Sequence, residues 1–142
     1  MNKLSVMVLT ILLGGSIAAC SNSTTQKTQQ TDNHTSQQSL DWSGKYVGLL
    51  PCADCGGIET SITLNENNTY EIVEVYQTEL ENNRFAEKGT FAWENGSVIT
   101  LKSKDSQRKY KVGENKLIAL DMQGKEVQGK LAPNYILTKE NN

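Results

Sequence analysis

The fold of this chain is decided by the stretch Ile58-Glu59-Thr60-Ser61-Ile62-Thr63-Leu64-Asn65-Glu66-Asn67-Asn68-Thr69-Tyr70. Its first seven residues place their aliphatic side chains on one face at a period of two, which is the pattern of a half-buried strand. Residues 65–68 follow as a turn, because asparagine tolerates a left-handed backbone and hydrogen-bonds its own main chain. Residues 70–77 are rich in β-branched and aromatic side chains, which favour a second, longer strand.

Further strands are expected on both sides of this pair. One covers residues 47–50 and ends at Pro51, and the others cover residues 85–93, 98–102, 108–112, 117–121, 126–128 and 134–138. Asn95-Gly96 predicts a hairpin with a type I′ turn, which needs a positive φ at both positions. Gly89 marks a bulge or a close approach of two backbones.

Eight or nine short strands at about ten-residue spacing, with no helical period between them, predict an all-β fold. The expected architecture is a single antiparallel up-and-down β-barrel, with a sandwich as the alternative. Closure into a barrel would remove the exposed edges of the sheet. The interior of an eight-stranded barrel is filled by side chains or holds one small ligand, and the aromatic residues favour a filled core.

The only cysteine pair in the folded part is Cys52-Ala53-Asp54-Cys55, on a loop between two expected strands. Pro51 and the following Gly56-Gly57 make this loop tight and irregular. The two thiols are near enough to share one metal ion or one disulfide, and both interpretations stay open. Soft sulfur ligands select Cu(I), zinc or iron–sulfur clusters, but zinc and cluster sites normally need four ligands. Asp54 is expected to be solvated.

The first forty residues are not part of the folded domain. Residues 1–19 are expected to be a lipoprotein signal peptide, because an apolar run from Leu4 to Leu13 is too short to span a bilayer. The signal would be cleaved between Ala19 and Cys20, since Ile-Ala-Ala-Cys is similar to a bacterial lipobox. Cys20 would then carry acyl chains such as palmitate. Residues 20–40 are expected to be a disordered linker of polar side chains, and residues 41–142 form the barrel domain.

The sequence argues against enzymes and nucleic-acid-binding proteins. The only histidine, His34, lies in the expected linker, so no Ser-His or Cys-His catalytic pair can form. The Cys-x-x-Cys motif also lacks the βαβ context of thioredoxin-like oxidoreductases. The formal net charge is −2 and no basic stripe is present, which argues against a surface that binds nucleic acid.

Several segments carry a resemblance to one known family. They are the run from Gly44 to Ile58, which contains Leu-Pro-Cys-Ala-Asp-Cys, and the segments Thr69-Tyr70, Gly89-Thr90-Phe91, Leu120-Asp121-Met122-Gln123-Gly124 and Tyr135-Ile136-Leu137. The chain resembles the N-terminal domain of the NlpE family, the copper-resistance and envelope-stress lipoproteins of Gram-negative bacteria. The resemblance covers residues 42–139.

The resemblance implies a lipocalin-like barrel and copper handling, with Cu(I) held by Cys52 and Cys55. It also implies an anchor in the Gram-negative outer membrane, on the periplasmic face, and signalling through the sensor kinase of the Cpx pathway. Ser21 after the lipidated cysteine fits export to the outer membrane. The alternative is a protein whose cysteines form a structural disulfide and whose barrel contacts a sensor kinase or binds a small apolar ligand. Members with two domains add a C-terminal OB-fold with its own cysteine pair. The sensing role of that domain is not expected here, since this chain ends at Asn142.

The lipidation of Cys20 can be tested by intact-mass spectrometry of protein extracted from the cell envelope. We expect the loss of residues 1–19 and a gain in mass from acyl chains. An unmodified N-terminus at any other residue would contradict the expectation.

Overall fold

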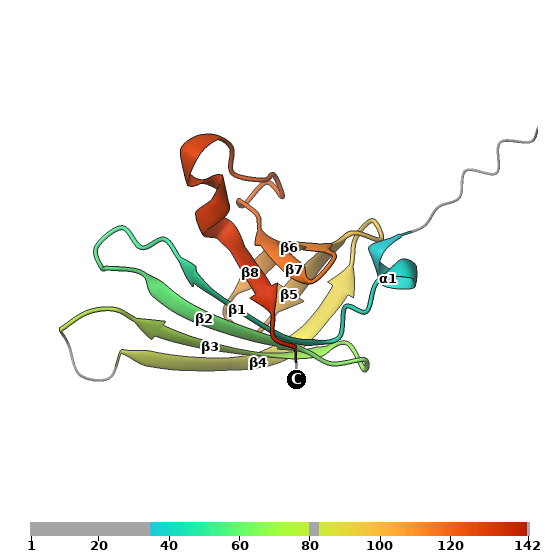
Figure 1. Cartoon of the computed structure of the whole chain (residues 1–142). Helices are drawn as coiled ribbons and strands as arrows, with labels where there is room; N and C mark the ends of the chain where they lie inside the picture. Colours follow the sequence, from blue (N-terminus) through green and yellow to red (C-terminus); the bar gives the residue numbers. More distant parts are fainter. Residues whose placement is uncertain (1–34, 80–82, 142) are drawn as a thin grey trace, which may run out of the picture. The chain divides into compact units, whose positions relative to one another are not determined.

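The computed structural model of the chain describes residues 35–79 and 83–141. Eight antiparallel strands follow one another around a closed barrel in sequence order (Figure 1). The strands are β1 Gly44–Leu50, β2 Ile58–Leu64, β3 Thr69–Tyr76, β4 Arg84–Trp93, β5 Val98–Lys102, β6 Gln107–Gly113, β7 Lys116–Ala119 and β8 Ile136–Lys139. The expectation of an all-β, up-and-down antiparallel barrel is therefore confirmed.

The barrel closes through a contact that has fewer residue pairs than any that joins consecutive strands. β1 pairs with β2 at seven positions, from Gly44↔Leu64 to Leu50↔Ile58. On its other side it pairs with β8 only at Tyr46↔Lys139 and Val47↔Thr138. A Cβ on Gly48 would lie 2.8 Å from the carbonyl oxygen of Ile136, so glycine lets the two backbones approach.

Inward side chains from all eight strands fill the barrel. Because side chains alternate between the two faces of a strand, each strand contributes every second residue to the interior. Burial of their apolar surface is the main stabilising term, at about 25 cal/mol per Å². The core residues are Tyr46, Ile62, Leu64, Tyr70, Ile72, Phe91, Ile99, Leu101, Tyr110, Val112, Leu117 and Leu137.

One end of the barrel, here called the linker end, is covered by residues that precede β1. The rings of Trp42 and Trp93 pack edge-to-face at 5.6 Å, and Trp42 packs on Phe91 in the same way at 5.7 Å. A single helical turn, α1 Ser36–Ser39, lies at this end (Figure 1). The hydroxyl of Ser36 donates a 2.8 Å hydrogen bond to the carbonyl of Val112. Residues 35–40, which were expected to belong to the disordered linker, are therefore ordered in the structure.

The C-terminal part differs from the sequence-based expectation. Residues 126–128 form no strand, because Glu126 makes only an isolated bridge to Leu120. The expected strand at residues 134–138 begins later, since a 3₁₀ helix, η1 Gly129–Tyr135, precedes β8. Gly129 has a φ of 84°, and Pro133 lacks a backbone N–H, so neither residue suits a continuing strand.

The turn at Asn95-Gly96 joins β4 to β5 as a hairpin, but not as the expected type I′ turn. Among the described residues, positive φ outside glycine occurs at Asn68 and Asn115, and not at Asn95. Asn95 instead accepts hydrogen bonds on its side-chain oxygen from the backbone N–H of Ser97 and of Val98, at 3.2 and 3.0 Å. The side chain stabilises a four-residue loop, residues 94–97, which is longer than the pattern predicts.

At Gly89 on β4, the neighbouring backbone of Lys102 approaches more closely than at any other glycine of the described residues. A Cβ there would lie 2.2 Å from the carbonyl oxygen of Lys102 and 2.9 Å from the ring of Tyr70. We expect Gly89→Ala to destabilise the barrel by about 1–3 kcal/mol, since backbone must move to accommodate it. Chemical denaturation measures this, with Gly56→Ala as the control. That Cβ would meet mainly the flexible side chain of Gln77, at 3.3 Å, so equal losses in the two variants would contradict the argument.

Candidate functional site

Cys52 and Cys55 lie on the β1–β2 loop, residues 51–57, at the end of the barrel opposite α1 (Figure 1). This end is here called the cysteine end. The two sulfur atoms form a disulfide of 2.06 Å, with the Cα atoms 5.3 Å apart. Both cysteines are half-buried, while Ala53 and Asp54 between them are exposed. The pair is thus accessible from solvent through the tip of the loop.

Backbone hydrogen bonds tie the second half of this loop to the end of β3. The N–H of Gly56 donates to the carbonyl of Gln77 at 3.1 Å, and the N–H of Gln77 donates to the carbonyl of Gly57 at 2.9 Å. Gly57 is buried and has a φ of 152°, and a Cβ on it would lie 2.7 Å from Cδ1 of Leu49. Since the side chain of Leu49 packs directly over Gly57, this position requires glycine.

The donor set of the loop suits a soft, low-coordinate metal ion. Once reduced, the pair would offer two thiolates, and Cu(I) takes soft sulfur ligands. Within residues 35–79 and 83–141, no three or more His, Cys, Asp or Glu residues are close enough to hold one metal ion. Structural zinc sites need four ligands, so the residues present fit Cu(I) better than zinc.

A partly buried ion pair lies in the barrel toward the cysteine end, and it was not predicted from the sequence. The guanidinium of Arg108 on β6 donates to both carboxylate oxygens of Glu74 on β3, at 2.5 and 3.2 Å. The side chain of Glu74 is only 9% exposed. The sequence position of Glu74 could have indicated its burial. Glu74 follows Tyr70 and Ile72 at a spacing of two, so all three side chains point to the interior from β3.

A second carboxylate lies beside this pair. Glu87 accepts hydrogen bonds from the hydroxyl of Tyr70 at 2.7 Å and from that of Ser106 at 2.8 Å. Burial disfavours the charged form of Glu87, but these donors outweigh it and lower the pKa of its carboxyl. Burial and the adjacent Glu87 raise the pKa of Tyr70. For Arg108, the hydrogen bonds to Glu74 outweigh burial and raise its pKa.

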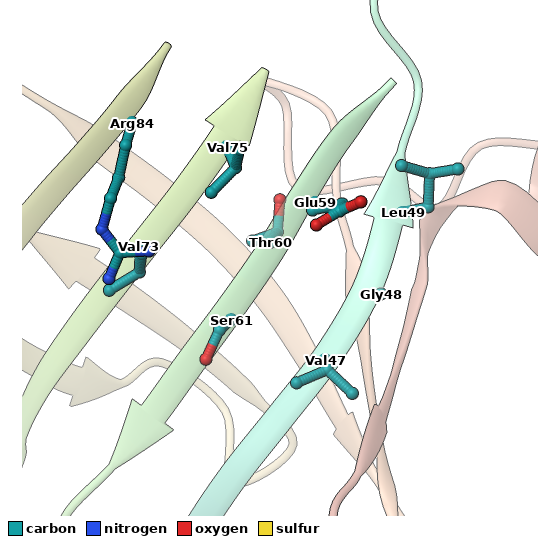
Figure 2. Close-up of a pocket in the computed structure, with 9 residues that line it drawn as sticks. All are labelled: Val47, Gly48, Leu49, Glu59, Thr60, Ser61, Val73, Val75 and Arg84. Carbon is teal, nitrogen blue, oxygen red and sulfur yellow. The ribbon is translucent and has the colours of Figure 1, made fainter. Parts of the chain in front are cut away.

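Two hollows lie near this end of the barrel. One, of about 370 Å³, opens between β1, β6 and β7 and is lined by residues that include Leu50, Arg108 and Tyr110. The other, of about 380 Å³, lies on the outer face of β1–β4 and is here called the outer groove (Figure 2). It is lined by Val47, Gly48, Leu49, Glu59, Thr60, Ser61, Val73, Val75 and Arg84.

A family model described as the NlpE N-terminal domain matches residues 46–130, which is more than half of the chain. The chain belongs to the NlpE N-terminal domain family. Lipoprotein NlpE of Escherichia coli K12 is 34% identical over 93 residues, a stretch that covers 65% of this chain and 39% of that protein. The chain thus spans well under half the length of this curated relative.

Two solved structures of similar proteins agree with the fold. A protein of Shewanella oneidensis that is assigned as a lipoprotein is 46% identical with a TM-score of 0.70, over 77% of this chain and 98% of that one. The Cpx pathway activator NlpE of E. coli is 34% identical with a TM-score of 0.54, over 61% of this chain and 46% of that one. These relatives are described as lipoproteins and as a pathway activator. This agrees with the expectation that the chain is not an enzyme.

The remaining sequence-based predictions concern residues that the structure does not describe. Ala19, Cys20 and His34 all lie outside the described residues, so cleavage, lipidation and the part of the linker before residue 35 stay predictions. Within the described part, no helix is long and apolar enough to cross a bilayer.

The hydrogen bonds to Glu87 predict how stability depends on pH. Because its pKa is lowered in the folded state, its stabilising effect is complete above the unfolded value of 4.5 and is lost as the pH falls through the folded value. We expect Glu87→Gln to reduce the free energy of unfolding by about 1–2 kcal/mol near pH 7 and by less near pH 2.5. Urea denaturation at both pH values measures this. Glu71→Gln, which removes only an exposed ion pair with Lys88, is the control. A loss for Glu87→Gln that does not change with pH would contradict the prediction.

Proposed function

We propose that this chain is an envelope lipoprotein that takes part in copper handling and in envelope-stress or surface sensing. The observation that carries the proposal is the half-buried disulfide of Cys52 and Cys55, which lies at the rim of the barrel on a loop whose tip is exposed. The pair has two functional states, a disulfide and a dithiol. The dithiol holds Cu(I) between two sulfur atoms.

The chemistry of this exchange balances with a dithiol as the reductant. The reductant transfers two electrons and two protons to the Cys52–Cys55 disulfide, and is itself oxidised to a disulfide. Binding of Cu(I) then releases the two thiol protons, because thiolates are the ligands. Because the loop lies outside the strands, neither step requires any strand to separate.

The proposal also includes a membrane anchor for the chain and a partner protein for the barrel. Acyl chains on Cys20 hold the protein in the outer membrane of a Gram-negative cell, on its periplasmic side. The barrel contacts the sensor domain of an envelope-stress kinase. Support for this partner comes from the E. coli relative that is described as the Cpx pathway activator.

The alternative function, a carrier of a small apolar ligand, has less support. Tyr46, Tyr70 and Ile62 are almost fully buried within the barrel, so their side chains occupy interior space that an apolar ligand would need. A purely structural disulfide is distinguished by alkylating thiols in protein taken directly from cells. Two free thiols favour the metal site, and protection that only a reductant removes favours the structural disulfide.

Copper binding is tested by competition with a chromophoric Cu(I) chelator under anaerobic, reducing conditions. We expect Cys52→Ser and Cys55→Ser each to weaken Cu(I) binding by about 10²- to 10⁴-fold, because one thiol loses the effective concentration of the second. Asp54→Asn is the matched control within the loop, and His34→Ala the control in the linker. Both should bind as wild type does. Serine variants that compete as well as wild type would exclude this loop as the copper site.

Signalling is tested in an E. coli strain that lacks its own NlpE and carries a reporter of the Cpx pathway. Overproduction of the full chain should raise reporter output, and Cys20→Ala, which cannot be lipidated, should raise it less. A silent reporter with correctly lipidated protein would count against the sensing role.

A further inference from the structure

Aliphatic side chains gather on the outer face of β1 and β3, where alternation should place polar residues. Val47 and Leu49 point outward from β1, and Val73 and Val75 point outward from β3. The strand register sets them in two adjoining rows, Val47–Ser61–Val73–Ala86 and Leu49–Glu59–Val75–Arg84. These rows form the outer groove (Figure 2). Leu49 is 50% exposed, so part of this apolar surface remains in contact with water.

The charges around the outer groove are not balanced within the described residues. Glu59 accepts a 3.0 Å hydrogen bond from the side-chain amide of Gln77. Arg84 forms no ion pair with any described carboxylate. Arg84 pairs with Val75 across β3 and β4, and it lines the outer groove together with Val73 (Figure 2). A guanidinium that borders an apolar groove matches a carboxylate, to which it can donate two hydrogen bonds.

This composition resembles the centre of a protein interface. Arginine is enriched at interface hot spots, which lie among well-packed apolar contacts. At about 380 Å³, the outer groove has the size of a small ligand site. That space suits a few side chains of a partner rather than a whole lipid molecule.

We propose that the outer groove binds a segment of a partner protein that presents aliphatic side chains beside a carboxylate, and that the Cys52–Cys55 disulfide holds one wall of the groove in place. The proposal rests on the sensing role above, since it names the surface through which the barrel would contact its partner.

The contacts that link the disulfide to the outer groove are short. Sγ of Cys55 lies 3.3 Å from the carbonyl oxygen of Gly57, and Gly57 supports the side chain of Leu49. The backbone of Gln77 is hydrogen-bonded to Gly56 and Gly57, and its side-chain amide donates a hydrogen bond to the carboxylate of Glu59. Opening the disulfide would remove one restraint on the loop, while the backbone hydrogen bonds at Gly56 and Gly57 remain. The side chains of Leu49 and Glu59 would then lose part of their order and would have to regain it when the partner binds. That ordering would weaken binding.

The binding arm uses full-length protein in detergent, with labelled valine methyl groups observed by NMR. The probe is a capped six-residue peptide of alternating leucine and glutamate, and the control peptide alternates leucine and lysine. We expect the glutamate peptide to shift the methyl signals of Val47, Val73 and Val75, and the lysine peptide to leave them unchanged. Equal shifts with both peptides, or none with either, would overturn the proposal.

Variants locate the binding surface. Arg84→Gln and Val73→Ser should each weaken binding of the glutamate peptide by about fivefold or more, as expected for the loss of a charged hydrogen bond or of a buried methyl pair. Ile118→Ser is the matched control, because Ile118 faces outward on β7 opposite Ile136 and lies outside the groove. Unchanged binding in the two groove variants would exclude this surface.

The redox arm repeats the titration after reduction of the disulfide and with the double variant Cys52→Ser, Cys55→Ser. Both should bind the glutamate peptide roughly two- to tenfold more weakly, the effect of ordering one or two further side chains on binding. Affinity that is unchanged on reduction would overturn the coupling between disulfide and groove.

Three further results separate this proposal from its rivals. If Val73→Ser alters only self-association in sedimentation, the occupant is a second copy, and if it alters only binding to phosphatidylethanolamine vesicles, the occupant is a lipid surface. Either result overturns the proposal. In the Cpx reporter strain, Val73→Ser and Arg84→Gln should lose output relative to wild type. Full output from both would reject the groove, whereas a silent wild type with intact peptide binding would reject only the sensing role.

Discussion

The contact between β1 and β8 is the constraint on which the rest of the structure depends. It joins only two pairs of residues, yet it converts a curved sheet into a closed barrel. Closure removes the free edges of the sheet and forces every second side chain into one interior. Gly48 permits the contact, because any larger residue would collide with the backbone of β8. The core, the two ends and the loops all take their positions from this closure.

The two ends of the barrel differ in chemistry. At the linker end, Trp42 packs on Phe91 and Trp93 and covers the core with apolar surface. Toward the cysteine end, the interior is polar, with the ion pair of Arg108 and Glu74. Polar groups there are stable because each is hydrogen-bonded. The cysteine loop therefore lies at the end where charge and hydrogen bonding, rather than apolar packing, determine the local structure.

The sequence predicted those features that depend on neighbouring residues. The strands around residues 65–68 follow from a period of two, and Asn68 has the left-handed φ that its turn requires. The cysteine loop was likewise located from Pro51, Gly56 and Gly57. Features that depend on distant residues were not predictable. Arg108 and Glu74 are 34 positions apart, and only the fold shows that they meet. The strand predicted at residues 126–128 was wrong, because Glu126 makes only an isolated bridge to Leu120. Whether a short polar run pairs over its whole length cannot be inferred from the local pattern.

The first and last residues of the barrel lie next to each other. The ammonium of Lys139 is 2.9 Å from the carboxylate of Asp41, and that of Lys45 is 2.8 Å from Glu140. A domain with adjoining termini can be inserted into, or joined to, other proteins without altering its internal connections. It should also tolerate circular permutation, with new ends cut between exposed residues such as Lys104 and Asp105. The barrel could therefore be transferred between proteins as a unit. A domain fused to its C-terminus would begin at the linker end and would leave the cysteine loop uncovered.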